Sequence, residues 1–168
     1  YFLLPSLRKK FQNETLDLLN IPDYKRLSSE VYRHIKTKFL YVTDHPYVIN
    51  NNSTEDIQNI PYWIILWLKE SFLKGVKKDE AQNIFIERND KVSDLPSQRM
   101  LSNEDEVKKY LLENNFISVK LHELKFIEQV KLFYNAKFIV GLHGSGFANT
   151  VFCEEGTNVI EFRSNNAG

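Results

Sequence analysis

From residue 83 onward, strand-like and helix-like patterns alternate along the chain, and this alternation constrains the fold more than any other feature. Short runs of β-branched and aromatic residues predict strands, and amphipathic stretches between them predict helices. Strands are expected at 84–86, 116–121, 138–140 and 159–162. One helix is expected to start at a capping-box-like pair, Ser102 with Asp105 or Asn103 with Glu106, and to end at 114–115, with further helices at 126–133 and from about Phe147. This order is typical of βαβ units in a mostly parallel sheet, with right-handed crossovers and helices on both faces.

Residues 1–78 mix helix and strand signals without repetition, and we assign them to a partial N-terminal or interdomain region. Residues 79–168 are expected to form the α/β domain. Within the first region, the patterns predict an amphipathic helix over 7–19, a short buried strand over 39–42 with a turn after it, and a polar loop over 50–55. Pro61 predicts the start of a helix that ends at Gly75 and is apolar on most faces, so we expect it to be buried.

Composition narrows the class of protein. The 168 residues are 42% hydrophobic, which suffices for one core, or for one domain and part of another. The chain has as many Lys and Arg residues as Asp and Glu residues, so its formal net charge is zero. This balance argues against a general nucleic-acid binder, which is usually basic. The single cysteine, Cys153, excludes an intrachain disulfide and is expected to be a small buried apolar residue.

Two further features concern the chain as a whole. No apolar run approaches the ~18 residues of a membrane span, so we expect no transmembrane segment in this stretch. The chain starts at Tyr1 rather than at a methionine, and we expect it to be part of a longer protein.

The sharpest local motif is the segment 141–149, Gly-Leu-His-Gly-Ser-Gly-Phe-Ala-Asn, which follows a predicted strand and opens a predicted helix. Small residues let a ligand approach the backbone closely, and the amides of a helix N-terminus favour an anion. His143 and Ser145 add donors beside Gly144 and Gly146, which suits a pyrophosphate. The alternative is a tight turn without a ligand, because short glycine motifs are common.

Two arginines are candidates for the same crevice. Arg88 lies just past the first strand of the regular region, and Arg99 precedes a predicted helix start. Ligands of parallel sheets bind at the carboxyl ends of the strands. Guanidinium groups contact phosphate oxygens bidentately, so the pair is suited to a phosphate ligand. The alternative is two ordinary surface arginines.

Four other polar residues have more than one interpretation. Glu104 lies in the first turn of a predicted helix, where the dipole stabilises a carboxylate without any ligand. Glu161 lies inside an apolar strand, where a carboxylate needs a partner. Its alternative roles are to accept hydrogen bonds from ribose hydroxyls, to orient the loop or to form a structural salt bridge. Asn149 is expected to cap or cross-link the short helix, and Gln129 to lie on the surface of its own helix.

Several catalytic and binding motifs are missing from the sequence. It has no G-x-x-x-x-G-K-[ST] phosphate loop and no G-x-S-x-G nucleophile elbow. Its four histidines do not fall at metal-ligand spacing with Cys153, which argues against a zinc site. It also has no D-x-D pair to hold a divalent ion under a nucleotide diphosphate.

An ordered series of residues resembles glycosyltransferase family 61, which includes bacterial capsular-polysaccharide biosynthesis proteins and eukaryotic xylosyl- and N-acetylglucosaminyltransferases. The strong part of the resemblance covers about residues 83–162, and a weaker part extends upstream through 11–19 and 61–72. The series comprises Arg88, Arg99, 103–106, 126–129, Ala136, 141–146, Asn149, Phe152, Gly156 and Glu161.

The resemblance implies a GT-B fold, in which two Rossmann-like domains face a cleft and the C-terminal one holds the nucleotide sugar. Residues 79–168 would be that domain, truncated at its C-terminal end. The implied enzyme transfers a hexose or pentose to a glycan or protein-linked acceptor with inversion, usually without a metal and without a cofactor. The nucleotide-sugar site would comprise Arg88, Arg99, Glu104, His143, Gly144, Ser145, Gly146, Asn149 and Glu161. The catalytic base is not identified by these residues.

The resemblance has departures and leaves alternatives open. The more usual loop has Ala at position 145 and Leu-Thr at 147–148. Because this chain has Phe147 and Ala148 instead, the identity of the nucleotide-sugar donor stays open. The expected role is surface-polysaccharide assembly, at the cytoplasm or a membrane if the source is bacterial and in the Golgi or ER lumen if it is eukaryotic. The alternatives are a non-catalytic nucleotide-binding or interaction module, and a different Rossmann-type enzyme that binds a phosphorylated cofactor.

Overall fold

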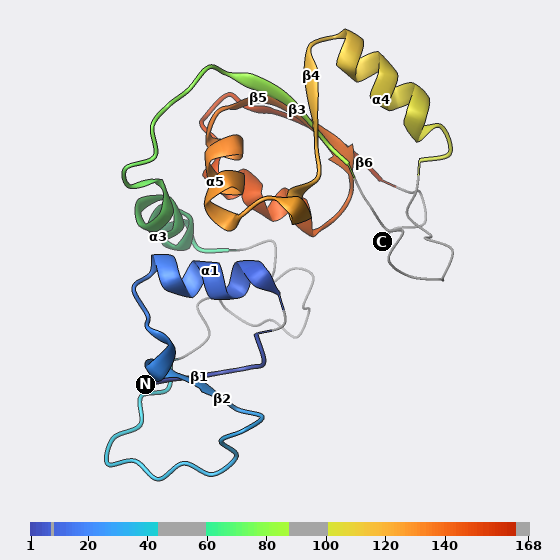
Figure 1. The fold of residues 1–168 in the computed structure, drawn as a ribbon. Helices are drawn as coiled ribbons and strands as arrows, with labels where there is room; N and C mark the ends of the chain where they lie inside the picture. The colour runs from blue at the N-terminus through green and yellow to red at the C-terminus, as the bar shows by residue number, and fades with distance from the viewer. Residues whose placement is uncertain (8, 44–59, 88–100, 164–168) are drawn as a thin grey trace. The chain divides into compact units, whose positions relative to one another are not determined.

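The computed structural model describes residues 1–7, 9–43, 60–87 and 101–163 (Figure 1). The chain divides into two compact units, Tyr1–Ser71 and Phe72–Gly168, which are described separately below. The assignment of 1–78 and 79–168 to particular domains stays a prediction, and the segments expected as a turn at 44–46 and a polar loop at 50–55 lie outside the described residues.

The first unit contains a small parallel pair of strands, β1 (Phe2–Leu4) and β2 (Arg26–Ser28). Helix α1 (Lys10–Leu18) and the 3-10 turn η1 (Asp23–Lys25) lie between them in the chain. The helix predicted over 7–19 is therefore confirmed, while the two strands were not predicted. Each strand has only three residues, too few to show an alternating pattern in the sequence.

Arg26 connects the elements of this unit. Its side chain is only 7% exposed and pairs with Asp17 at 2.5 Å and Asp23 at 2.8 Å. Its Nε also donates to the main-chain oxygen of Ile21 at 2.7 Å. One guanidinium group thus satisfies acceptors from α1, η1 and the connection between them.

Two sequence-based expectations for the first region are wrong. Residues 39–42 form no strand, and Tyr41 is 91% exposed, because no neighbouring strand among the described residues offers this short apolar run a ladder to join. Helix α3 (Tyr62–Leu73) does begin after Pro61 and end before Gly75, whose φ is +81°. The expected burial of α3 is not observed, since Phe72 is its one buried residue and Trp63 is 60% exposed.

The second unit is built on a sheet of four parallel strands in the order β4-β3-β5-β6. This confirms the predicted mixed α/β architecture, consistent with a Rossmann-like fold. The strands are β3 (Gln82–Ile86), β4 (Phe116–Val119), β5 (Ala136–Leu142) and β6 (Asn158–Phe162). The connections contain α4 (Glu104–Glu113), η2 (Leu121–Glu123), α5 (Phe126–Tyr134) and η3 (Ser145–Phe152).

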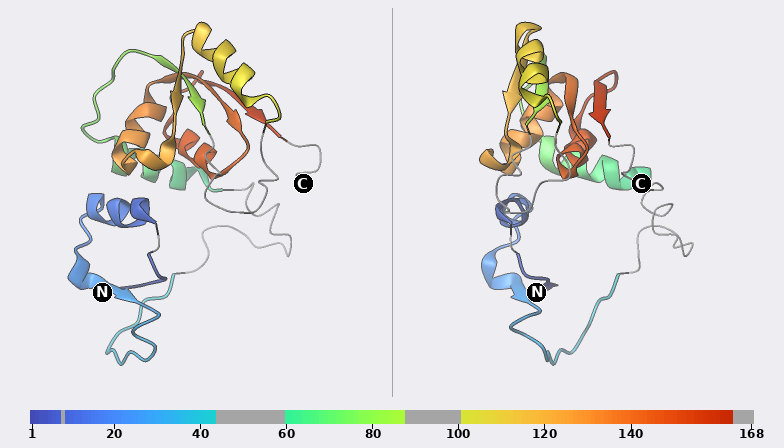
Figure 2. Two further views of the ribbon diagram at one scale, coloured as in Figure 1. Left: turned by 45° about the vertical axis from the view of Figure 1, so that its right-hand side comes forward. Right: turned by 90° about the vertical axis from the view of Figure 1, so that its right-hand side faces the viewer.

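The helices cover both faces of this sheet, as Figures 1 and 2 show, with α4 on one face and α5 and η3 on the other. Successive side chains of a strand point to opposite faces. Phe85 and Val140 therefore pack against Leu111 of α4. Ile84 and Ile139, their neighbours in the strands, are fully buried on the opposite side. Cys153 is buried, as the sequence predicts.

Candidate functional site

The strand order places a topological switch point between β3 and β5. From β3 the chain crosses through α4 to β4 at one side, whereas β5 leads through η3 to β6 at the other. The loops after two such strands diverge, and ligands of open α/β sheets bind in the crevice between them. These two loops, which follow Ile86 and Leu142 in the structure, are the ones predicted from the sequence to bind the ligand.

Two glycines allow the close packing at this crevice. A Cβ on Gly141 would lie 3.1 Å from Ile86 Cβ and 3.3 Å from both Ile86 O and Phe147 Cζ. A Cβ on Gly146 would lie 2.8 Å from Leu121 Cδ1. Glycine is thus favoured at 141 by contacts with the neighbouring strand, whereas a side chain at 146 would require the end of the Leu121 side chain to move. Gly144 has φ 172°, an extended conformation that any residue adopts.

The glycine-rich segment continues into η3, which is a 3-10 helix and begins at Ser145 rather than near Phe147. Its first hydrogen bond runs from Phe147 N to Gly144 O at 3.1 Å. The amides of Ser145 and Gly146 precede that bond and have no partner within the helix. Amides at such a terminus favour a negatively charged ligand. Ser145 is exposed, and Gly144 and Gly146 are half-buried.

His143 lies beside these amides and contacts a carboxylate. Its Nδ1 is 2.7 Å from Glu161 Oε1, and Arg163 Nε donates to the other oxygen, Oε2, at 2.7 Å. The main-chain N of His143 donates to Phe162 O at 2.9 Å, which continues the β5–β6 ladder past the end of β5. The partner that the sequence analysis required for Glu161 is therefore a pair of side chains, one in the glycine-rich segment and one just after β6.

These contacts keep Glu161 ionised. Burial by itself raises the pKa of the Glu161 carboxyl. The hydrogen bonds from His143 and Arg163, together with the charges of Arg163 and His143, lower this pKa by more than burial raises it. The net pKa lies below the ordinary value. A carboxylate next to the imidazole therefore persists at neutral pH.

A second carboxylate, Glu87, lies at the same edge of the sheet and was missed by the sequence analysis. Its Oε1 contacts Lys108 Nζ of α4 at 2.5 Å and accepts from Ser118 Oγ of β4. Burial raises the pKa of Glu87, but the hydrogen bonds from Lys108 and Ser118 and the charges of Lys108 and Lys120 outweigh it, and the net pKa is lowered. The signal available in the sequence was its position directly after a buried strand.

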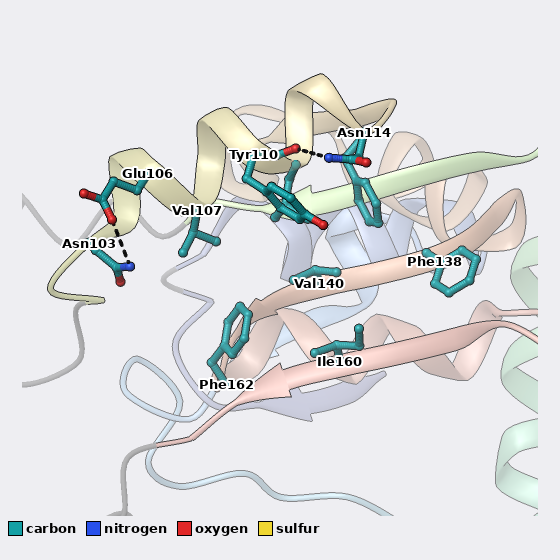
Figure 3. A pocket seen from close by; sticks show the side chains of 11 residues that line it. Asn103, Glu106, Val107, Tyr110, Asn114, Phe138, Val140, Ile160 and Phe162 are labelled. Atoms are coloured by element: carbon teal, nitrogen blue, oxygen red, sulfur yellow. Dashed lines mark hydrogen bonds between the residues drawn. The ribbon is translucent and has the colours of Figure 1, made fainter.

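A separate concavity, here called the α4 groove, lies on the other side of the unit from η3 (Figure 3). Its volume is about 760 Å³, and its walls are mainly apolar side chains of α4, β5 and β6, including Val107, Val140 and Phe162. Tyr110 lies over it from α4. Among the described residues its lining has no glycine, lysine or arginine, so these walls do not suit a phosphate group.

Comparison with known families assigns the chain. The family model of glycosyltransferase 61 matches residues 3–160. The chain belongs to the glycosyltransferase 61 family. The match confirms the resemblance seen in the sequence and extends through the first unit. A search of curated proteins finds no match. Family membership implies transfer of a sugar from a donor to an acceptor.

The remaining predicted site residues of this glycosyltransferase are Arg88, Arg99, Glu104 and Asn149. Arg88 and Arg99 lie outside the described residues. Glu104 is half-buried in the first turn of α4. The capping-box-like start predicted around 102–106 is not formed. Asn103 is the cap residue, its side chain makes no bond to the main chain, and its Nδ2 donates to Glu106 Oε2 at 3.4 Å.

Asn149 cross-links η3 to α5, as one of its expected roles requires. Its Nδ2 donates to Gln129 Oε1 at 3.0 Å, and Gln129 Nε2 donates to Leu121 O at 2.9 Å. The expectation that Gln129 is an ordinary surface residue is wrong, since it is half-buried and links three segments. This chain of bonds holds η3 beside Leu121, the residue against which Gly146 packs.

None of the helices in the described ranges is both long and apolar enough to span a bilayer. Residues 1–7, 9–43, 60–87 and 101–163 contain no cluster of three or more His, Cys, Asp or Glu side chains arranged to hold a metal ion.

Proposed function

We propose that the end of β5 in this glycosyltransferase binds the diphosphate of a nucleotide-sugar donor, within the donor-binding domain of a GT-B enzyme that inverts and needs no metal. The observation that supports this most is the arrangement of Ser145 and Gly146 amides and His143 at one strand end, beside the switch point. Main-chain amides and an imidazolium are donors that a diphosphate accepts from. The proposed setting is surface-polysaccharide assembly.

The proposed chemistry places these donors at the leaving group. An acceptor hydroxyl oxygen attacks the anomeric carbon, the bond from that carbon to the diphosphate oxygen breaks, and the nucleoside diphosphate leaves with the bonding electrons. A base takes the proton of the hydroxyl. Negative charge grows on the departing oxygen, and fixed donors there lower the barrier because they need no reorganisation during the reaction.

Further donors for the same diphosphate stay predictions from the sequence. Arg88 and Arg99 are proposed to contact it bidentately. The base is expected on another part of the protein, because in GT-B enzymes the acceptor faces the second domain.

Calorimetry with UDP, GDP, dTDP and ADP tests the proposal on the full-length protein. We expect at least one to bind, and His143→Ala to weaken that binding about 10-fold to 100-fold, as loss of a charge-assisted hydrogen bond does. Lys131→Ala is the matched control, because it removes a basic side chain that pairs with Asp79 at 2.6 Å, just before the amino end of β3. An absence of binding by wild type, or equal affinities in His143→Ala and wild type, would contradict the proposal.

Turnover separates catalysis from binding alone. Donor hydrolysis or sugar transfer is measured with the nucleotide sugar of whichever diphosphate binds. Binding without any turnover would favour a non-catalytic module over a transferase, whereas turnover that falls in His143→Ala would support the enzyme.

A further inference from the structure

Both carboxylate oxygens of Glu161 are occupied by side chains of the protein. Oε1 contacts His143 Nδ1 and Oε2 accepts from Arg163 Nε, each at 2.7 Å. The Glu161 side chain is 22% exposed, less than that of His143 at 41% or Arg163 at 62%. The carboxylate thus lies deeper than the imidazole and the guanidinium group that it joins.

The register of the sheet explains how residues eighteen positions apart in sequence meet. Gly141 pairs with Glu161, and Leu142 pairs with Phe162. Parallel strands bring their carboxyl ends to one edge. His143 is the first residue after β5, and its main-chain bond to Phe162 O keeps it alongside the end of β6. The pairing of the two side chains therefore follows from backbone geometry.

We propose that Glu161 is a positioning residue for His143: its carboxylate accepts the hydrogen bond from Nδ1–H and orients the ring, so that Nε2–H of the doubly protonated ring is the donor to the diphosphate. This inference rests on the proposed function for the role of Nε2. In this role Glu161 acts through His143 and makes no direct contact with the nucleotide. Arg163 has a supporting part, because it fixes the second oxygen of the carboxylate.

Two physical arguments favour this role over direct binding. A carboxylate beside a diphosphate repels it, whereas a carboxylate behind an imidazole is separated from the diphosphate by the ring that it orients. A hydrogen bond to one ring nitrogen also fixes the tautomer and the ring orientation, which determines what the other nitrogen does. Each oxygen of Glu161 already accepts from a side chain, so a ribose hydroxyl would have to share an oxygen with His143 or Arg163, or displace one of them.

The first test follows the ring nitrogens of His143 by ¹⁵N NMR in the absence of nucleotide, with His143→Ala to assign the signals. We expect Nδ1 to carry a proton in wild type and in Glu161→Gln, whose side-chain oxygen still accepts a hydrogen bond. Glu161→Ala should show a mixture of tautomers. A wild-type ring that is protonated on Nε2 alone, or one that does not change in Glu161→Ala, would overturn the positioning role.

The second test is a double-mutant cycle on nucleoside diphosphate affinity, with whichever of UDP, GDP, dTDP and ADP binds wild type most tightly. Glu161→Ala should weaken binding about tenfold in wild type and less than about twofold in His143→Ala, because coupled residues are not additive. Glu161→Gln should fall between wild type and Glu161→Ala, since orientation is kept and charge is lost. An equal loss from Glu161→Ala in both backgrounds would show that Glu161 acts on the ligand directly.

The two tests distinguish this inference from the proposed function. If wild type binds no nucleoside diphosphate, the proposed function fails, and the ¹⁵N signals still decide whether Glu161 sets the tautomer of His143. If nucleotide binds but the cycle is additive, the proposed function stands and the positioning role fails.

Discussion

The carboxyl edge of the sheet has two regions that use the same residue type in different ways. At the end of β3 and β4, Glu87 is paired with Lys108 and Ser118, which belong to α4 and β4. At the end of β5 and β6, Glu161 is paired with His143 of the glycine-rich segment. Both carboxyl pKa values are lowered. The perturbed pKa alone therefore does not locate a site. The partners distinguish the two carboxylates, because Glu87 pairs with a lysine and a serine whereas Glu161 pairs with a histidine of the proposed diphosphate site.

The largest expected effect comes from the close approach of β5 to β3. Gly141→Val would place carbon atoms against Ile86 and Phe147. The Cβ atom alone would lie 3.1 Å from Ile86 Cβ and 3.3 Å from Phe147 Cζ. We expect a loss of about 2–3 kcal/mol in the free energy of unfolding, measured with urea, because overpacking a core costs that much.

Lys137→Val is the control for that substitution, because Lys137 is an exposed position of the same strand. Its effect should stay below about 0.5 kcal/mol. Equal stabilities of wild type and Gly141→Val would mean that β5 does not press against β3 at this edge.

The next largest effect should separate the two carboxylates. Glu87→Ala leaves Lys108 and Ser118 without their acceptor, and we expect a loss of about 1–2 kcal/mol in unfolding free energy. Nucleoside diphosphate affinity should change less than about twofold, the reverse of the pattern expected for Glu161→Ala. Urea unfolding and calorimetry on both variants would measure this, and a large affinity loss in Glu87→Ala would place the ligand at the β3–β4 end instead.

Acidification should weaken the β3–β4 end. A lowered pKa in the folded state means that the Glu87 contribution to stability is present above the unfolded pKa and is lost as the pH falls through the folded pKa. Wild type should therefore lose stability as the pH drops below about 4.5. Glu87→Gln should lose less over the same range, by up to about 1 kcal/mol, in urea unfolding at a series of pH values. Identical pH slopes for the two proteins would contradict the ion pair.

The smallest effect is expected at Arg163, whose side chain is 62% exposed. Arg163→Ala should change the unfolding free energy by less than about 0.5 kcal/mol, since exposed ion pairs contribute little. It should weaken nucleotide binding about twofold to threefold through Glu161, which calorimetry resolves. A loss as large as that of His143→Ala would assign Arg163 a direct contact with the ligand.

The sheet was predictable because each of its strands is a short apolar run between clear turn signals. The run at 84–86, for example, is buried on both faces, and such strands show no polar interruption. The same reasoning failed at 39–42, because an apolar run is a strand only where a neighbour pairs with it. It also missed β1 and β2, whose pairing depends on tertiary contacts such as those of Arg26.

The candidate site was predictable in its location but not in its contacts. Strand ends and glycine spacing located His143, Ser145 and the loop after β3. The bond between His143 and Glu161 requires the β5–β6 register, which no local pattern encodes. The link from Asn149 through Gln129 to Leu121 likewise joins three segments that only the fold brings together.

Mapping nucleotide binding by ¹H–¹⁵N NMR tests the central claim most directly. A nucleoside diphosphate that binds the protein is titrated while the main-chain amide signals are followed. The diphosphate should shift the amides of Gly144, Ser145 and Gly146 most, with smaller shifts at Glu87 and Ser118 and none along the α4 groove. Saturable binding with unshifted amides at 144–146, or with the largest shifts at residues that line the α4 groove, would contradict the claim.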